Sequence, residues 1–356
     1  MENFTLVGLS EIADMAEPKV TKQAVANWRR RFDDFPRPHQ TLSSGPVWNK
    51  EVIEGWLLKK GGLAPKVISF INLKGGVGKT TTSIGVAEVL AYHHKMNVLF
   101  IDLDPQTNAT INLIGEERWQ ECNNKGQTLA QLFRDKIQFD REPIFDIEKA
   151  ILRGVSMVDG GIPRLDLLPS SIEFIELQER LPFVGVQGEF QVNPQIILRD
   201  ALKPVIERYD WVVIDCPPSL GIVTKNGLRM TTHYCIPTIP DIVSTWGIYQ
   251  IVRSIDTFAD SVSSKIEAAG IVATKVQVNR LHSRIIEDMS QGRLFAGKNT
   301  GHVQPRLLAN QIRQRAVTAA GANADAGRMS LSSKYGPENY EELKGLTKEL
   351  MQVCHN

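Results

Sequence analysis

The sequence predicts an α/β protein with a doubly wound, mostly parallel sheet, preceded by a small separate domain. After residue 65, β-rich apolar runs alternate with helical patterns, and this alternation is typical of a parallel sheet covered by helices. A length of 356 residues allows two or three domains. The charged, Gly/Pro-containing stretch at 59–65 indicates a linker, so we expect domains at residues 1–62 and 63–356.

The strands of the larger domain are expected where apolar, β-branched residues cluster. These runs are Lys66–Ile71, Asn97–Ile101, Leu165–Leu168, Trp211–Ile214, Tyr234–Ile239 and Gly270–Val278. Apolar residues recur at helical spacing in Thr80–Tyr92, Pro194–Arg208 and Tyr249–Ala259. Residues 115–160 have weaker periodicity, and the sequence leaves their structure open.

The composition is that of a soluble globular protein. Hydrophobic residues make up 42% of the chain and charged residues 23%, which argues against disorder. No apolar run reaches the roughly 18 residues that span a bilayer, and the first residues lack the pattern of a secretory signal. The four cysteines form no C-x-x-C pair, which disfavours a disulfide framework or a zinc site. We expect a cytoplasmic protein that does not bind membranes.

Two basic clusters lie within a chain whose formal net charge is only +1. Residues 19–31 contain Lys19, Lys22, Arg29, Arg30 and Arg31 and no acid. Residues 289–335 contain one acid, Asp325, and the basic residues Arg293, Lys298, Arg306, Arg313, Arg315, Arg328 and Lys334. Such clusters can mark a polyanionic partner, although two solvated faces would give the same pattern.

The strongest motif is a glycine-rich loop between the first predicted strand and the first predicted helix. It consists of Lys74, Gly75, Gly76, Val77, Gly78, Lys79, Thr80 and Thr81. Glycines allow the backbone N–H groups to surround phosphates, and the helix adds its positive end. We expect Lys79 to reach the β- and γ-phosphates and Thr80 to bind Mg²⁺. The first glycine of the usual G-x-x-x-x-G-K-[ST] pattern is replaced by Leu73.

Three aspartates follow predicted strands at the sheet edge where open α/β sheets bind ligands. Asp102 and Asp104 follow the second strand, and Asp215 follows the strand that begins at Trp211. A carboxylate in this place can hold a Mg²⁺-bound water or orient an attacking water, and we expect Asp215 to lie in the Mg²⁺ shell. Any one of these aspartates could instead be a helix cap or turn residue.

The loop and two further segments resemble the deviant Walker A ATPases of the ParA/MinD family. Besides K-G-G-x-G-K-T-T, the segments Leu99–Gln106 and Trp211–Ser219 resemble that family's later motifs, and Leu165–Ser171 fits the ParA branch. The resemblance implies that Lys74 reaches across a homodimer to the partner's nucleotide. It also implies that Asp104 positions the attacking water and that Asp102 supports the Mg²⁺ network.

The nucleotide is expected to be ATP. A guanine-binding loop usually has the sequence N-K-x-D, whose carboxylate accepts hydrogen bonds from the base, whereas here Asn279 is followed by Arg280, Leu281 and His282. Asn279 resembles the family's adenine-contacting asparagine, and a capping asparagine at the sheet edge is the alternative.

Residues 6–60 predict a helix-turn-helix followed by a wing. Ser10 can cap a helix over Glu11–Ala16, and Thr21 can cap a second helix from Lys22 to about Arg31. Residues 35–48 would form the wing, and a helix from Asn49 would close the domain with Val52, Ile53, Trp56 and Leu57 inward. Val25 and Trp28 share the apolar side of the second helix, which leaves Lys22, Gln23, Asn27, Arg29 and Arg30 to contact bases or phosphates. The segment resembles winged modules of the MerR and excisionase type. A small helical domain that contacts proteins is the alternative.

Together these features resemble plasmid-partition ParA proteins that carry an N-terminal winged helix-turn-helix domain. The resemblance implies a nucleoid-associated ATPase of weak intrinsic rate that segregates plasmid or chromosomal DNA. ATP would drive dimerisation and non-specific DNA binding through Arg293, Arg306, Arg313 and Arg315. A ParB-type centromere-binding protein would stimulate hydrolysis. The first domain would make the protein an autorepressor. The alternatives are a nucleotide-regulated transcriptional repressor without a segregation role, and a positioner of a protein cargo on the nucleoid.

Overall fold

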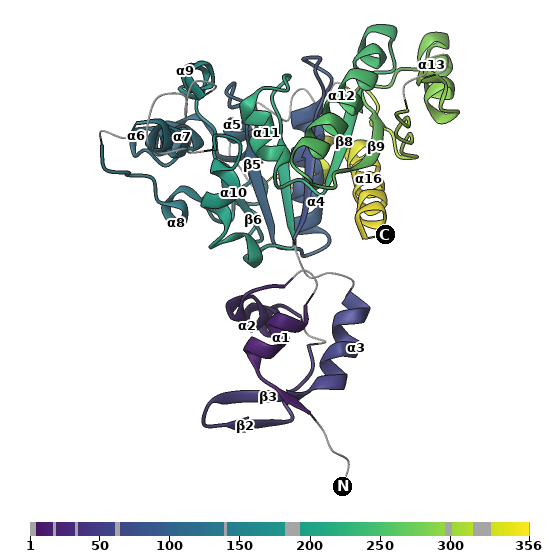
Figure 1. Cartoon of the computed structure of the whole chain (residues 1–356). Helices are drawn as coiled ribbons and strands as arrows, with labels where there is room; N and C mark the ends of the chain where they lie inside the picture. Colours follow the sequence, from purple (N-terminus) through teal and green to yellow (C-terminus); the bar gives the residue numbers. More distant parts are fainter. Residues whose placement is uncertain are drawn as a thin grey trace. The chain divides into compact units, whose positions relative to one another are not determined.

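The computed structural model describes residues 5–16, 19–32, 35–60, 65–138, 141–181, 193–295, 301–315 and 329–355. The chain divides into two compact units, the first formed mainly by residues 1–65 and the second mainly by residues 66–354 (Figure 1). Of the expected linker at 59–65, Lys59 and Lys60 belong to the last helix of the first unit, and residues 61–64 lie outside the described residues. Lys298 and Arg328 of the carboxy-terminal basic cluster also lie outside them.

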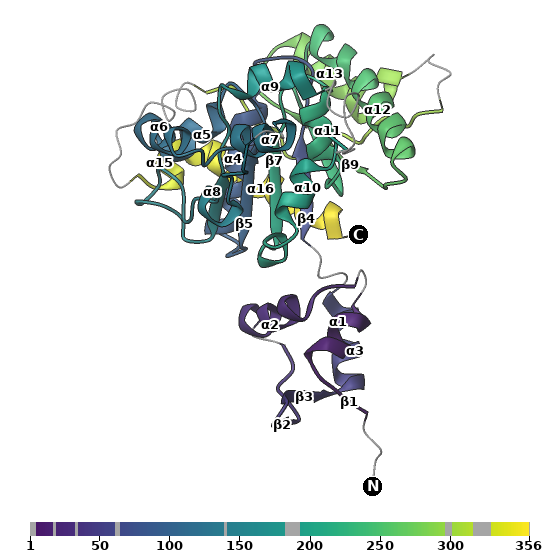
Figure 2. The ribbon, with the colours of Figure 1, turned by 60° about the vertical axis from the view of Figure 1, so that its left-hand side comes forward.

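The second unit is built on a six-stranded sheet in the order β6-β5-β7-β4-β8-β9, and every neighbouring pair in it is parallel. This confirms the predicted parallel sheet. Helices flank the sheet (Figure 2). The strands are β4 (Lys66–Phe70), β5 (Val98–Asp102), β6 (Leu165–Leu168), β7 (Trp211–Asp215), β8 (His233–Thr238) and β9 (Glu267–Ala273).

The strands form because they are apolar on both faces, as expected for a sheet with helices on both sides. All residues of β5, β6 and β7 are buried. In the register of the sheet, Asp102 at the end of β5 pairs with Asp215 at the end of β7, and Asp215 also pairs with Phe70 at the end of β4. The three predicted motifs therefore meet at one edge of the sheet.

The helix after β4 is α4 (Lys79–Tyr92), which is buried along most of its length. The remaining helical elements of the unit are α5 (Asn108–Ile114), α6 (Glu116–Asn124), α7 (Leu129–Ile137), α8 (Ile147–Ala150), α9 (Phe174–Arg180), α10 (Ile197–Leu202), α11 (Ile222–Leu228), α12 (Ile242–Ser261), α13 (Arg280–Ser290), η3 (Arg293–Phe295), α15 (Leu331–Tyr335) and α16 (Pro337–His355). The short helix η2 (Ile206–Arg208) is grouped with the first unit. The stretch 115–160, which the sequence left open, thus contains α6, α7 and α8.

Two expected elements differ in extent from those of the structure. The last strand ends at Ala273 rather than Val278, because the backbone beyond it turns at Lys275, whose φ is +50°. The expected helix Pro194–Arg208 is instead the shorter α10 followed by the single turn η2.

The first unit consists of three helices and a three-stranded sheet in the order β1-β3-β2. Its elements are β1 (Leu6–Val7), α1 (Leu9–Met15), α2 (Lys22–Arg31), β2 (Gln40–Leu42), β3 (Gly45–Asn49) and α3 (Lys50–Lys60). Its core contains the buried Val25, Trp28, Trp48 and Ile53. The indole N–H of Trp48 donates a hydrogen bond to the carbonyl of Pro36 at 2.8 Å.

Sequence reasoning located α2 and its cap correctly, since Thr21 accepts a hydrogen bond from the backbone N–H of Ala24 at 3.2 Å. The cap expected at Ser10 was wrong. Helix α1 begins earlier, after Gly8, whose backbone N–H donates to the carboxylate of Glu11 at 3.1 Å. Val52 was also misplaced, because its side chain is 53% exposed and does not face the core.

Candidate nucleotide-binding site

The glycine-rich loop joins the end of β4 to α4 and is shaped by two glycines with left-handed backbone. Gly76 has a φ of +73° and Gly78 a φ of +82°, values that residues with a Cβ rarely adopt. Left-handed residues spaced along a loop direct successive N–H groups toward one concave side. Gly78 is the cap of α4, a helix of 14 residues, so the loop combines its own N–H groups with the positive end of a long helix.

A cavity of about 370 Å³ lies against this loop and the start of α4. Seven of the predicted site residues line it, namely Gly75, Gly76, Gly78, Lys79, Thr80, Thr81 and Asp104. Val77 lies within the loop and is buried. The cavity is also lined by residues that were not predicted to belong to the nucleotide site, among them Gln106, Asn108, Asn112, Lys275, Lys334 and Tyr335.

Thr80 and Asp215 form the part of the site that could hold a cation. The Thr80 hydroxyl donates to Asp215 Oδ2 at 2.7 Å, and the other carboxylate oxygen, Oδ1, is buried without a hydrogen-bond partner in the described part of the chain. Burial raises the pKa of Asp215 to about 7, against the lowering effects of Thr80 and of the Lys79 ammonium. An orphaned buried oxygen beside a hydroxyl is a donor set that suits Mg²⁺.

Asp102 is fully buried next to this pair and does not line the cavity. One carboxylate oxygen accepts from the hydroxyl and the backbone N–H of Thr110 at 2.7 and 2.9 Å, and the other accepts from the N–H of Asp104 at 3.1 Å. Burial and the neighbouring Asp215 raise its pKa. The Asp102 carboxylate therefore stabilises the backbone conformation at Asp104.

Asp104 lies in the wall of the cavity, beyond the end of β5. Its carboxylate accepts a hydrogen bond from the backbone N–H of Gln106 at 3.0 Å. Burial raises its pKa, opposed by that hydrogen bond and by the charge of Lys79. A carboxylate of raised basicity that borders the cavity has the chemistry needed to orient and polarise a water molecule.

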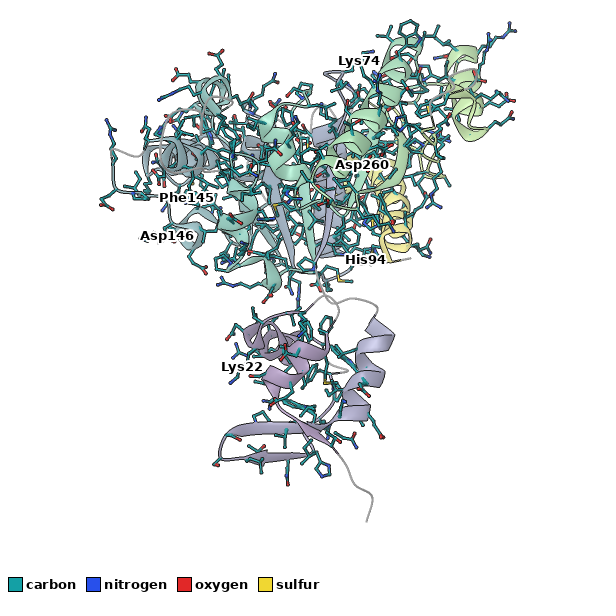
Figure 3. The ribbon with its side chains drawn as sticks, in the orientation of Figure 1. Lys22, Lys74, His94, Phe145, Asp146 and Asp260 are labelled. Atoms are coloured by element: carbon teal, nitrogen blue, oxygen red, sulfur yellow. The ribbon has the colours of Figure 1, made fainter. Side chains whose placement is uncertain are left out.

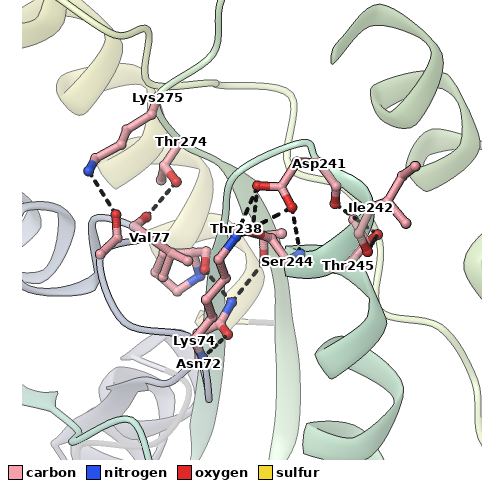
Figure 4. Close-up of polar contacts among 12 residues, drawn as sticks. Asn72, Lys74, Val77, Thr238, Asp241, Ile242, Ser244, Thr245, Thr274 and Lys275 are labelled. Atoms are coloured by element: carbon pink, nitrogen blue, oxygen red, sulfur yellow. Dashed lines mark hydrogen bonds and ion pairs between the residues drawn. The ribbon is translucent and has the colours of Figure 1, made fainter. Parts of the chain in front are cut away.

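The two lysines of the loop occupy different surroundings. Lys79 is buried in the cavity wall, with 6% of its surface exposed. Lys74 does not line the cavity: its ammonium lies 3.2 Å from Asp241 Oδ2 and 2.8 Å from the Ser244 hydroxyl (Figure 4). Asp241 is the N-cap of α12. Sequence patterns did not indicate this contact, because Lys74 and Asp241 are 167 positions apart in the chain.

Asn279 is the N-cap of α13, where its side chain accepts from the backbone N–H of His282 at 2.8 Å. This is the alternative role that the sequence allowed. Asn279 is not among the residues that line the cavity. Its expected contact with adenine stays a prediction.

The carboxy-terminal basic cluster does not form one open surface in the described residues. Lys334 was expected on that surface, but it is 4% exposed and its ammonium pairs with the fully buried Glu88 at 2.8 Å. Arg315 pairs with Glu338 and Glu342 of α16, and Arg293 pairs with Asp288. Counting charges along the sequence missed this, because the neutralising acids come from other segments.

Arg306 and Arg313 remain exposed. In the first unit, Lys22, Gln23, Arg29 and Arg30 of α2 are exposed and Asn27 is half-buried. The Gln23 amide donates to Asn27 at 3.4 Å, and the Arg29 guanidinium lies 5.9 Å from the ring centre of Trp48. One side of α2 is thus polar and open, while Trp28 on its other side is buried.

Comparisons with known proteins agree with this site. A family model described as an AAA domain matches residues 65–268. The chain is 30% identical over 228 residues to the sporulation initiation inhibitor protein Soj of Bacillus subtilis, in a match that covers 64% of this chain and 79% of Soj. The chain belongs to the ParA-type P-loop ATPases.

Two other relatives match this chain over similar lengths. The chromosome partitioning protein ParA of Myxococcus xanthus is 30% identical over 212 residues, covering 59% of this chain and 64% of that protein. An uncharacterized protein of Mycobacterium tuberculosis is 31% identical over 219 residues. That match covers 62% of this chain and 61% of the mycobacterial protein.

Solved structures share the fold of this ParA-type chain. A cobyrinic acid a,c-diamide synthase of Mycobacterium smegmatis, with bound ATP analogue and magnesium, has a TM-score of 0.59 at 22% identity and covers 81% of this chain and 95% of its own. A plasmid partition protein of Borrelia burgdorferi bound to AMPPNP has a TM-score of 0.53 at 22% identity, with coverages of 79% and 98%. Among the described residues, no helix has the length and apolar character needed to cross a membrane.

Proposed function

We propose that this chain is an ATP-dependent DNA-partitioning ATPase that switches between a free state and an ATP-bound homodimer. The observation that supports the proposal most strongly is that the two lysines of the loop lie in different places. Lys79 lies in the cavity of its own chain, whereas Lys74 is held outside it by Asp241 and Ser244. Such an arrangement leaves Lys74 available to a nucleotide bound by a second copy.

ATP and Mg²⁺ are the proposed cofactors. The loop N–H groups and Lys79 would bind the phosphates, and Thr80 and Asp215 would hold the metal, which supplies charge neutralisation at the phosphates. Asp104 would orient the attacking water. The names of the partitioning relatives and the ATP analogues in structures of the same fold support this assignment.

DNA is the proposed macromolecular partner, in two modes. The first unit, with two helices followed by a β2–β3 hairpin, would act as a winged helix-turn-helix in which α2 reads an operator through Lys22, Gln23, Asn27, Arg29 and Arg30. Arg306, together with Arg293, Arg313 and Arg315 if their acidic partners release them, would contribute to sequence-independent binding in the dimer.

We further propose a centromere-binding partner of ParB type that accelerates hydrolysis, a weak intrinsic rate, and a cytoplasmic, nucleoid-associated location. The partitioning relatives support the partner and the location. The exposed polar side of α2 favours one second candidate, a nucleotide-regulated repressor without a segregation role.

The decisive experiment measures fluorescence polarisation of random-sequence DNA with ATP, ADP or no nucleotide. Wild-type protein should bind tightly only with ATP, with a steep salt dependence. Lys74→Ala should lose this ATP effect, while Lys95→Ala, a matched change at an exposed lysine on the same unit, should retain it. Equal binding in all three nucleotide states would overturn the partitioning model, and tight binding to one operator with little affinity for random DNA would favour the repressor.

A further inference from the structure

Two consecutive residues that follow β9 hold backbone carbonyls of the glycine-rich loop. The hydroxyl of Thr274 donates to the carbonyl of Val77 at 2.6 Å, and the ammonium of Lys275 donates to the carbonyl of Gly76 at 2.7 Å (Figure 4). Nearly 200 residues separate these partners along the chain. Neither contact belongs to the phosphate chemistry described above.

These contacts fix which way the loop's peptide planes face. In a planar trans peptide the C=O and the next residue's N–H point in opposite directions. When the carbonyls of Gly76 and Val77 are held on the outside, the N–H groups of Val77 and Gly78 must point to the inside. The next carbonyl, that of Gly78, is held by α4, where it accepts from the Thr82 hydroxyl at 2.7 Å.

The inward N–H groups are free to bind an anion. Within the described residues, the N–H groups of Val77 and Gly78 donate no hydrogen bond to another group of the chain. Peptide N–H groups that converge on one side without a partner are suited to the oxygens of a nucleotide's polyphosphate.

Lys275, which donates to the Gly76 carbonyl, has a strained backbone conformation. Its φ of +50° is left-handed, a conformation that costs free energy in a residue with a Cβ. Thr274 is buried, with 2% of its surface exposed, and its backbone N–H donates to the backbone carbonyl of Thr238 in β8 at 2.9 Å. The donors are therefore carried by a rigid strand end rather than by a free loop.

We propose that Thr274 and Lys275 are positioning residues for the phosphates: they hold the loop carbonyls outward so that the N–H donors face the phosphate site before the nucleotide arrives. This inference rests on the proposed nucleotide function of the same cavity. It assigns a role to a strand end that provides no residue of the phosphate-loop motif. Binding is strengthened because the loop needs less ordering when the ligand arrives.

The test measures ADP affinity by calorimetry and melting temperature without nucleotide. Thr274→Val should raise the Kd for ADP about threefold to tenfold, the range expected for one lost hydrogen bond. Thr274→Ser, which keeps the hydroxyl, should stay within about twofold of the wild type. Thr257→Val is the matched control, because Thr257 is an exposed threonine on α12 whose hydroxyl donates to a helix carbonyl at 2.8 Å.

Lys275→Gly separates positioning from simple stability. Glycine adopts a left-handed φ without strain, so the melting temperature should not fall, yet the Kd for ADP should rise by a similar threefold to tenfold. Because Lys275 is exposed, this variant keeps the test valid if Thr274→Val fails to fold. Lys275→Met should weaken ADP binding at both low and high salt, whereas a purely electrostatic role would vanish at high salt.

Each failure points to a different conclusion. If wild-type protein binds no ADP, or if Lys79→Ala binds it equally well, the proposed nucleotide function is wrong. If the wild type binds ADP and both Thr274→Val and Lys275→Gly bind it as tightly, the positioning role is overturned and the nucleotide function stands. Equal weakening by Thr274→Ser and Thr274→Val also contradicts the role of the hydroxyl.

Discussion

Replacing Asp241 with asparagine should favour the ATP-dependent dimer, if Lys74 must leave Asp241 to reach the partner's nucleotide. Asparagine caps a helix about as well as aspartate, so α12 keeps the hydrogen bond that Asp241 Oδ1 accepts from the backbone N–H of Ser244 at 2.7 Å. The variant therefore loses chiefly the ion pair, whose Nζ–Oδ2 distance is 3.2 Å.

The expected size follows from the exposure of the pair. The Lys74 and Asp241 side chains are 38% and 27% exposed, so solvent screens their attraction and about 0.5 kcal/mol is a reasonable value within the range for such pairs. A dimer breaks two of these pairs, which makes the total about 1 kcal/mol. The dimer dissociation constant should then fall about fivefold.

Sedimentation velocity with a slowly hydrolysed ATP analogue measures this constant directly. Asp260→Asn is the matched control, because it removes the same charge from an exposed position near the other end of α12 (Figure 3). A double variant with Lys74→Met should show no tightening due to Asp241→Asn. The reasoning is refuted if Asp241→Asn dimerises no more tightly than Asp260→Asn, or if the tightening survives without Lys74.

Three further outcomes follow from buried groups. Burial raises the pKa of Asp215 to about 7, and its ionised form is the one that binds a cation. The Mg²⁺ concentration for half-maximal ATP binding should therefore rise about tenfold for each pH unit below that pKa and become constant above it. Calorimetric titrations that show the same Mg²⁺ requirement at every pH would contradict this expectation. Glu88→Ala leaves the Lys334 ammonium buried and unpaired and removes the acceptor of the Tyr335 and Ser156 hydroxyls, so it should cost about 3–5 kcal/mol of unfolding free energy by urea denaturation. Adding Lys334→Met should restore the part due to the unpaired ammonium, and equal losses in both variants would exclude the ion pair as a cause. Trp48→Ala removes a fully buried side chain and should lower the free energy of unfolding of the first unit by about 3–5 kcal/mol. Scanning calorimetry should then show that the thermal unfolding transition of the first unit is lost, while the protein still binds ADP. Loss of ADP binding in the same variant would contradict this expectation.

The features predicted correctly from sequence are those encoded in short segments. Strand β6 and helix α2 were located because their apolar patterns and the cap at Thr21 are local. The glycine-rich loop was located because its residues are contiguous between a strand and a helix. The seven predicted residues that line the cavity also include Asp104, which follows β5, a strand separated from β4 by β7.

The features that sequence reasoning missed depend on contacts between distant segments. Lys334 was counted as a surface charge, but its partner Glu88 lies 246 positions away. Arg315 is neutralised by Glu342, 27 positions later on α16. Both acids lie outside residues 289–335, the segment in which the charges were counted, so the count could not show that burial and pairing remove these basic residues from the surface.

The sheet order explains how one loop serves two separable tasks. Strand β4 lies between β7, which carries Asp215, and β8, beside which β9 leads into Thr274. The cation side and the loop-positioning side are therefore on opposite flanks of β4. Asp215→Asn should weaken ADP binding only when Mg²⁺ is present, whereas Thr274→Val should weaken it equally with Mg²⁺ and with EDTA. Calorimetric titrations of both variants under both conditions test this, and a loss of the Thr274→Val effect in EDTA would show that β9 acts through the metal rather than through the loop's N–H groups.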